Sequence, residues 1–194
     1  MNEIETESKT NDRLEQGDVY SNIDYIESIE TIENDIFIKK IVFPYVVVLS
    51  QDCDLEQASA YYRETEKPDD QDKKLLSIIV APLYNEEMFL KGEHLADATI
   101  NYKMQIFTKM KKGNNLTTQY KNLIDNKNPR YYYLSFKDKT IMPPSIIDFK
   151  HFFCVDISYL NSCRKEKFIC KIKALYRESI TQRYSHFLSR IGLP

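Results

Sequence analysis

Apolar residues in this chain are concentrated in a few short runs separated by charged and turn-forming segments. The strongest run is Tyr45–Leu49, which is rich in β-branched residues, starts after Pro44 and ends at Ser50. Continuous apolar character predicts a strand buried on both faces, whereas a surface strand alternates with period two. A second run, Leu75–Ala81, predicts another buried strand that Pro82 ends.

The remaining pattern predicts further strands and short helices. Residues 23–32 carry apolar positions at mixed spacing among acids, which is compatible with either a strand or a helix. Residues 56–74 are polar and predict a long mobile loop. The other predicted strands cover 36–43 with an interruption at Lys39-Lys40, 130–136, 145–149 and 152–157, and the predicted short helices cover 86–95, with Met88, Phe89 and Leu90 inward, and 116–124.

The end of the chain has a helical period. From Lys171 onward apolar residues recur at steps of three and four, namely Ile172, Leu175, Tyr176, Ile180, Tyr184, Phe187, Leu188 and Ile191. A helix with such an apolar stripe usually packs against a sheet.

Together these elements predict an α+β fold, with a strongly bent sheet or small SH3-like barrel of five to seven strands, short helices and an amphipathic C-terminal helix. Residues 1–15 predict a disordered or loosely ordered acidic arm, and residues 16–194 a single domain.

Composition places the chain among globular proteins, with 42% hydrophobic and 29% charged residues in 194. No apolar run reaches the roughly 18 residues of a membrane span, and the N-terminus has no signal-peptide pattern, so we expect a cytoplasmic protein without a membrane partner. Cys53, Cys154, Cys163 and Cys170 lack paired spacing and predict reduced thiols. Nothing matches a P-loop, a dinucleotide fingerprint or HExxH, so no cofactor is expected.

Charge is distributed unevenly along the chain. Residues 1–36 contain 11 acidic and 2 basic side chains, and the other 158 contain 18 acidic and 25 basic. The basic part includes aromatic residues. Bases stack on aromatic rings and phosphates pair with Lys or Arg, so this combination is compatible with binding of single-stranded RNA or DNA. The candidate nucleic-acid-binding residues are Lys109, Lys111, Lys112, Lys121, Lys127, Arg130, Tyr131 and Tyr133, with Tyr132 on the opposite face of the strand. A half-buried strand beside solvated lysines explains the same pattern.

A polar cluster follows the strongest apolar run. Asp52, Cys53 and Asp54 lie where that predicted strand ends, a common location for catalytic groups. A hydrolase or nuclease would use these three residues with Arg130. Flanking acids raise the pKa of a thiol unless a cation intervenes, so a reactive Cys53 requires a nearby cation.

Other interpretations of this cluster involve different partners. A nucleophilic Cys53 needs His94 or His151 as its base, and a zinc site would combine Cys53, Asp54 and a histidine. A structural interpretation makes Cys53 a small buried hydrophobe and gives Asp54 a turn-bracing role, with a salt bridge to Arg130.

Two short motifs resemble the PemK/MazF toxins, a family of small SH3-like barrels that cut RNA. Gly17-Asp18-Val19-Tyr20 is similar to their opening strand, and Pro44 with Val46–Ser50 to their second signature, so the resemblance covers residues 16–82. An arginine precedes that proline in the family, where this chain has Phe43. The family's catalytic arginine would fall within 21–43, which contains no Arg, and its Ser/Thr corresponds to Ala81-Pro82. The resemblance implies a barrel relative without the family's ribonuclease residues.

A second resemblance is to a group of bacterial proteins with Ser/Thr-Gln-x-Cys-Asp-Leu/Ile after an apolar strand and Asn-Pro-Arg before a later one. Here these motifs are Ser50–Leu55 and Asn128-Pro129-Arg130. The likeness implies a shared site and names no chemistry.

The leading hypothesis is therefore a catalytically degenerate PemK/MazF-like barrel protein that binds nucleic acid or a protein partner in a bacterial regulatory or defence system, such as a toxin-antitoxin pair. The alternatives are the hydrolase or nuclease described above and a pure protein-interaction module that uses the acidic arm.

Overall fold

The computed structural model describes residues 3–8, 11–63, 72–96, 106–111 and 115–190. Along the chain they form β1 (Thr6–Glu7), β2 (Asp18–Ile32), β3 (Asp35–Val48), α1 (Asp52–Arg63), β4 (Ser77–Asn85), α2 (Glu86–Lys91), α3 (Thr118–Ile124), β5 (Tyr131–Leu134), β6 (Ser145–Asp148), the 3-10 helix η1 (Phe149–His151), β7 (Phe153–Asp156), α4 (Ile157–Lys167), β8 (Phe168–Ile172) and α5 (Ala174–Leu188).

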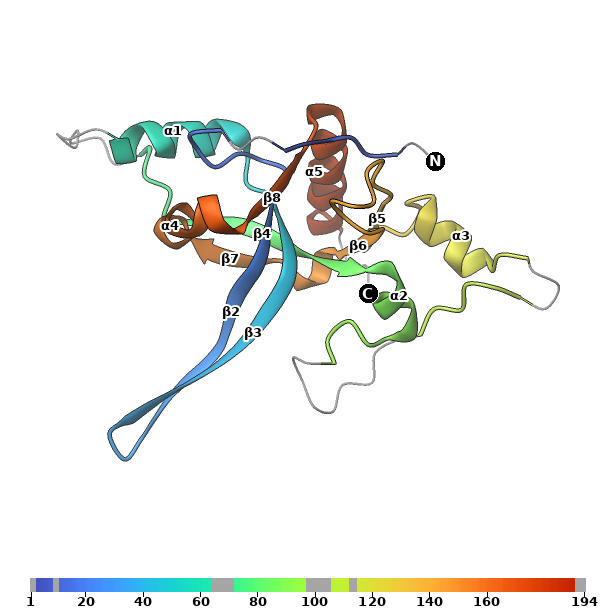
Figure 1. The fold of residues 1–194 in the computed structure, drawn as a ribbon, viewed down its shortest axis with the longest axis horizontal. Coiled ribbons are helices and arrows are strands. Elements are labelled where there is room, and N and C mark those ends of the chain that lie inside the picture. The colour runs from blue at the N-terminus through green and yellow to red at the C-terminus, as the bar shows by residue number, and fades with distance from the viewer. Residues whose placement is uncertain (1–2, 9–10, 64–71, 97–105, 112–114, 191–194) are drawn as a thin grey trace.

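The strands form one strongly curled, antiparallel sheet, which confirms the predicted α+β fold with a bent sheet (Figure 1). The order is β1-β8-β2-β3-β4-β6-β5, and β7 pairs with the first part of β4. The described residues contain eight strands, one more than the predicted range. The predicted C-terminal helix is α5.

Strand β3 is buried on both faces at its C-terminal end, as predicted. Val46 and Val48 pack into one hydrophobic core, and Val47 and Leu49 into a second core on the opposite face of the sheet. All four side chains are at most 3% exposed. Alternation along the strand thus sends successive side chains into two separate cores, which is why the run contains no polar residue.

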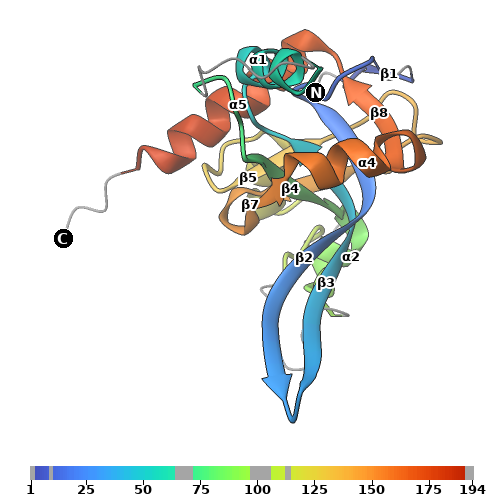
Figure 2. The ribbon, with the colours of Figure 1, turned by 90° about the vertical axis from the view of Figure 1, so that its left-hand side faces the viewer.

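The other half of β3 pairs with β2 in a long two-stranded ribbon that projects from the body of the molecule (Figures 1 and 2). The undecided segment 23–32 is therefore a strand. Lys39 and Lys40 do not interrupt β3, because each forms a cross-strand salt bridge, with Glu27 at 2.6 Å and Asp24 at 2.8 Å.

Strand β4 continues through Pro82, where the sequence predicted its end. Pro82 lies opposite Val46 of β3, and the strand runs on to Asn85. The residues before Pro82 pair with β7 and those after it pair with β6, so the proline lies at the junction between two pairing partners, where a missing N–H is tolerated.

The prediction of a long loop over 56–74 was wrong for its first part, because α1 occupies residues 52–63. Leu55, Ala58 and Tyr61 recur at steps of three and are at most 4% exposed, so one helix face packs on the core. Residues 64–71 of that prediction lie outside the described residues.

The region before the C-terminal helix also differs from the prediction. Helix α4 and strand β8 precede α5, so Ile172 belongs to a strand and α5 begins at Ala174. In α4 the buried positions are Ile157, Leu160 and Cys163, a short i, i+3, i+6 stripe among polar residues. The predicted helices at 86–95 and 116–124 are confirmed as α2 and α3, although Met88 is 40% exposed.

The described residues of the segment 1–15, predicted as a loose arm, lie against the domain. Ile4 is 4% exposed and bridges to Phe136, and β1 pairs with β8. Gly17 follows with φ of +83°, and a Cβ there would approach the Cβ of Arg177 to 3.0 Å, so the turn into β2 requires glycine.

Asp18, the first residue of β2, is a buried acid. Its side chain accepts hydrogen bonds from the Glu15 amide at 3.0 Å and the Tyr20 hydroxyl at 3.1 Å. Burial raises the pKa of Asp18 to about 7, against an ordinary value of 3.8. Between these two values the folded protein holds a proton that the unfolded chain has released, so this group's contribution to stability falls as pH rises from 4 to 7.

We therefore expect Asp18→Asn, which keeps an acceptor without the charge, to gain stability relative to wild type as pH rises. The difference in free energy of unfolding between variant and wild type should increase by about 2 kcal/mol between pH 5 and pH 8. Urea unfolding at a series of pH values measures it. A difference that is the same at every pH would show that Asp18 does not titrate in this range.

Candidate functional site

Asp52, the first predicted catalytic residue, is a structural anchor in the first turn of α1. Its carboxylate accepts hydrogen bonds from both terminal nitrogens of Arg13 at 3.2 Å and from the Gln16 amide at 3.2 Å. Arg177 of α5 lies 3.8 Å away. Partial burial opposes ionisation, but the Arg13 and Gln16 hydrogen bonds outweigh it and lower the pKa of Asp52. The residue joins three segments: the chain before β2, α1 and α5.

Cys53 and Asp54 lie on the exposed side of α1. The Cys53 thiol is 3.6 Å from oxygens of Gln51 and Asp54, and it contacts no cation or histidine among the described residues. Cys53 is exposed, so its interpretation as a small buried hydrophobe was wrong. In the described part of the chain, the structure therefore places no base or cation beside the Cys53 thiol.

Arg130, the predicted fourth member of the cluster, has a different partner. Its guanidinium makes two hydrogen bonds to Asp148 of β6, at 2.8 Å from Nε and 2.5 Å from a terminal nitrogen. Asp148 is 1% exposed. The predicted salt bridge between Asp54 and Arg130 was therefore wrong, and the structure does not bring Arg130 to Asp52, Cys53 or Asp54.

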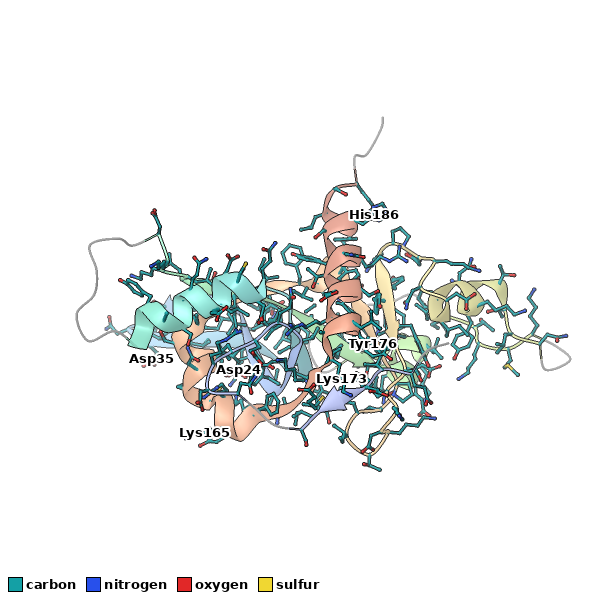
Figure 3. The ribbon with its side chains drawn as sticks, turned by 90° about the horizontal axis from the view of Figure 1, so that it is seen from above. Asp24, Asp35, Lys165, Lys173, Tyr176 and His186 are labelled. Atoms are coloured by element: carbon teal, nitrogen blue, oxygen red, sulfur yellow. The ribbon has the colours of Figure 1, made fainter. Side chains whose placement is uncertain are left out.

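The histidines are also separate from the thiol. The ring of His94 packs on Tyr84 and Phe89, burial lowers its pKa to about 4, and its ring nitrogens lack a hydrogen-bond partner among the described residues. His151 contacts Tyr84 through a 2.9 Å hydrogen bond. His186 lies near the far end of α5 (Figure 3). The described residues contain no group of three or more His, Cys, Asp or Glu placed to hold a metal ion.

The predicted nucleic-acid groove is closed in the structure. Tyr131, Tyr132 and Tyr133 are each at most 8% exposed, so their rings pack in the interior and present no stacking platform. The interpretation as a buried strand is the one that fits. Of the candidate lysines, Lys111, Lys121 and Lys127 are exposed, and Lys112 lies outside the described residues.

Lys109 and Tyr133 belong instead to a network around Glu86. The Glu86 carboxylate accepts hydrogen bonds from the hydroxyls of Tyr120 at 2.5 Å and Tyr133 at 3.2 Å, and Lys109 lies 3.0 Å away. Burial opposes ionisation of Glu86, but these donors lower its pKa. The network holds α3 and the segment before it against α2 and β5, which is a structural role.

A different feature has the character of a functional surface. It is the ribbon, residues 24–42 of β2 and β3 with their connecting turn. Alternate cross-strand rows share a face, so Ile29 with Ile38 and Thr31 with Ile36 lie on the same side as Ile26 with Lys40 and Asp24 with Val42. The aliphatic face of the ribbon is thus Ile26, Ile29, Ile36, Ile38 and Val42, which are 47–68% exposed.

The tip of the ribbon is acidic. Residues 24–42 contain five acidic and two basic side chains, and Lys39 and Lys40 are both engaged by Glu27 and Asp24. Glu30, Glu33 and Asp35 form no salt bridge with the described residues. Glu33 and Asn34 both have positive φ, 51° and 77°, which fits a tight two-residue turn in a twisted hairpin.

The sequence contains a signal for this surface. Residues 23–32, whose apolar positions among acids left strand and helix both open, are followed by further apolar residues in the predicted strand 36–43. A hairpin whose strands carry apolar residues on both faces, and which extends beyond the core, exposes apolar side chains on both faces. Ile32 and Phe37, opposite the aliphatic face, are 52% and 54% exposed.

No protein-family model matches the chain, and no curated protein matches it in sequence. Within the described residues, no helix has the length and apolar character needed to cross a membrane.

The two carboxylates of the predicted cluster should behave differently on substitution. Asp52→Ala removes the acceptor of three hydrogen bonds, two from Arg13 and one from the Gln16 amide, so we expect a loss of about 1–3 kcal/mol in the free energy of unfolding. Asp54→Ala, on the exposed side of the same helical turn, is the matched control and should change it by less than about 0.5 kcal/mol. Chemical denaturation measures both, and equal losses would contradict the anchoring role of Asp52.

Proposed function

We propose that this protein is a non-catalytic interaction module that binds a partner protein on the aliphatic face of the ribbon. The observation that carries the proposal is the exposure of five aliphatic side chains on an element that projects from the domain. A monomeric protein rarely exposes a contiguous apolar patch of several hundred Å² unless that patch is an interaction site.

The ribbon is suited to docking by its construction as well as by its composition. Beyond the region where β8 and β4 pair with β2 and β3, both edges of the ribbon are unpaired within the described part of the chain. Open edges offer backbone N–H and C=O groups, and the side-chain face offers burial. A partner that covers this face and pairs with an edge would bury the exposed isoleucines and satisfy the unpaired backbone groups in one contact.

Charge indicates the chemistry of the partner. Glu33 and Asp35 at the tip form no salt bridge with the described residues, so a partner that covers the aliphatic face and extends over the tip would carry Lys or Arg beyond its apolar strip. A second copy of this chain would instead bring a ribbon of the same net charge. We therefore take the occupant to be a different protein with a basic and apolar surface.

This proposal retains part of the hypothesis drawn from the sequence, that of a catalytically degenerate PemK/MazF-like protein with a protein partner in a bacterial regulatory or defence setting. The missing family arginines and the curled sheet are compatible with it. The nucleic-acid form and the Asp52-Cys53-Asp54 hydrolase receive no support from the contacts described above.

The test places a photo-crosslinking amino acid at position 36, on the aliphatic face, in the cell that makes the protein. The crosslinked partner is then purified, and its affinity is measured for wild type and for Ile29→Ser/Ile38→Ser. Each isoleucine contributes about 1.5–3 kcal/mol when buried, so the double variant should bind at least about tenfold more weakly.

Leu175→Ser is the matched control, because Leu175 is an aliphatic residue of α5 that is 72% exposed and does not belong to the ribbon. It should bind the partner like wild type. Unchanged affinity of the double variant would refute the proposal. So would light scattering that shows wild type forming a dimer that the double variant loses, because the occupant would then be a second copy.

A further inference from the structure

A polar relay beneath η1 points to a second site, separate from the ribbon's aliphatic face. Asp148 is held by two hydrogen bonds from Arg130 and a third from the Lys150 amide at 3.0 Å. The Tyr84 hydroxyl lies 2.9 Å from Nδ1 of His151, whereas the nearer Asp148 oxygen is 3.6 Å from that nitrogen, which is beyond hydrogen-bond length.

The direction of the Tyr84–His151 hydrogen bond sets which ring nitrogen of His151 carries the proton. Burial, reinforced by Asp148, raises the pKa of Tyr84, so its hydroxyl remains protonated. The only acceptor for that proton among the described residues is Nδ1 of His151. With Tyr84 as the donor to Nδ1, the neutral imidazole carries its own hydrogen on Nε2, which has no protein partner in the described part of the chain and is a free donor.

A cavity of about 480 Å³ lies beside this donor. Its walls are mainly aromatic: the rings of Phe43 and Phe153 are stacked with centroids 5.2 Å apart, and Tyr25 meets Phe153 edge to face at 5.3 Å. Lys150 and His151 also line it. This volume is in the range of small-molecule sites, which are mostly apolar with a few placed polar groups.

The polar groups of the cavity select for an anion. Lys150 and the Nε2–H of His151 are donors, and the described lining contains no carboxylate. Asp148, which lies 3.6 Å from Nδ1 of His151, is buried and already paired with Arg130. A carboxylate can therefore accept from both donors, while the aromatic walls favour a flat ring over an aliphatic one.

We propose that this cavity binds a small planar aromatic carboxylate, with its ring against Phe153 and Tyr25 and its carboxylate between Lys150 and Nε2 of His151. The proposal does not rest on the partner-binding function of the ribbon, since its ligand contacts lie at the opposite end of the ribbon from the acidic tip and the test requires no partner.

The test titrates the full chain into 2-naphthoate and follows the anisotropy of the naphthalene emission, which the absence of Trp leaves free of interference. We expect saturable binding to wild type, at least about tenfold weaker binding of the neutral analogue 2-naphthol, and no displacement by an equal concentration of cyclohexanecarboxylate. Absence of saturable binding, or equal binding of 2-naphthol, would overturn the proposal.

Two variants and one control locate the binding. Lys150→Ala alters an exposed side chain and is expected to fold normally, and His151→Phe keeps a ring without the donor; each should weaken 2-naphthoate binding at least about tenfold. Lys165→Ala, an exposed lysine on α4 at the edge of the molecule, should not change it (Figure 3). Wild-type affinity in Lys150→Ala, or an equal loss in Lys165→Ala, would show that the anion is not bound in this cavity.

Discussion

The two-sided burial of β3 is the constraint on which the rest of the structure depends. Its C-terminal half supplies alternate side chains to two cores, so the strand cannot shift register by one residue without exchanging every contact on both faces. Its N-terminal half carries the same backbone out into solvent as one arm of the ribbon. A strand that is fixed so firmly at one end can support a long projection at the other without a third strand beside it. The proposed interaction surface is therefore a continuation of a strand that is anchored in both cores.

Much of the architecture could be predicted from local pattern, and the failures have identifiable causes. The runs around Val46 and Ile78 indicated buried strands because continuous β-branched residues have few other uses. Helices α1 and α4 were missed because the side chains that each is seen to bury, in the part of the chain described, are three at steps of three. The polar residues between them, as around Ala58, resemble a loop. The extent of β3 was underestimated because Lys39 and Lys40 look like a break until their cross-strand acids are known.

The candidate site was harder to predict, because its components are joined by long-range pairing. Arg130 was predicted as a partner of Asp52, Cys53 and Asp54, but the sequence contains many acids, and only the pairing of β5 with β6 selects Asp148. Asp52 drew attention by its neighbours, although its hydrogen bonds go to the segment before β2. The exposed isoleucines, such as Ile36, show the opposite failure. Apolar character predicts burial on average and cannot by itself identify the apolar residues that the fold leaves exposed.

Tyr25 and Ile41 face each other at the root of the ribbon, and both also line the aromatic cavity. The base of the ribbon therefore also forms part of the wall of the cavity. If a partner on the ribbon changes the affinity of the cavity for a small molecule, thermodynamic linkage requires that the small molecule change the affinity of the ribbon for the partner by the same factor. Coupling between the two sites would need no moving domain, only two residues whose backbone belongs to the ribbon and whose side chains line the cavity.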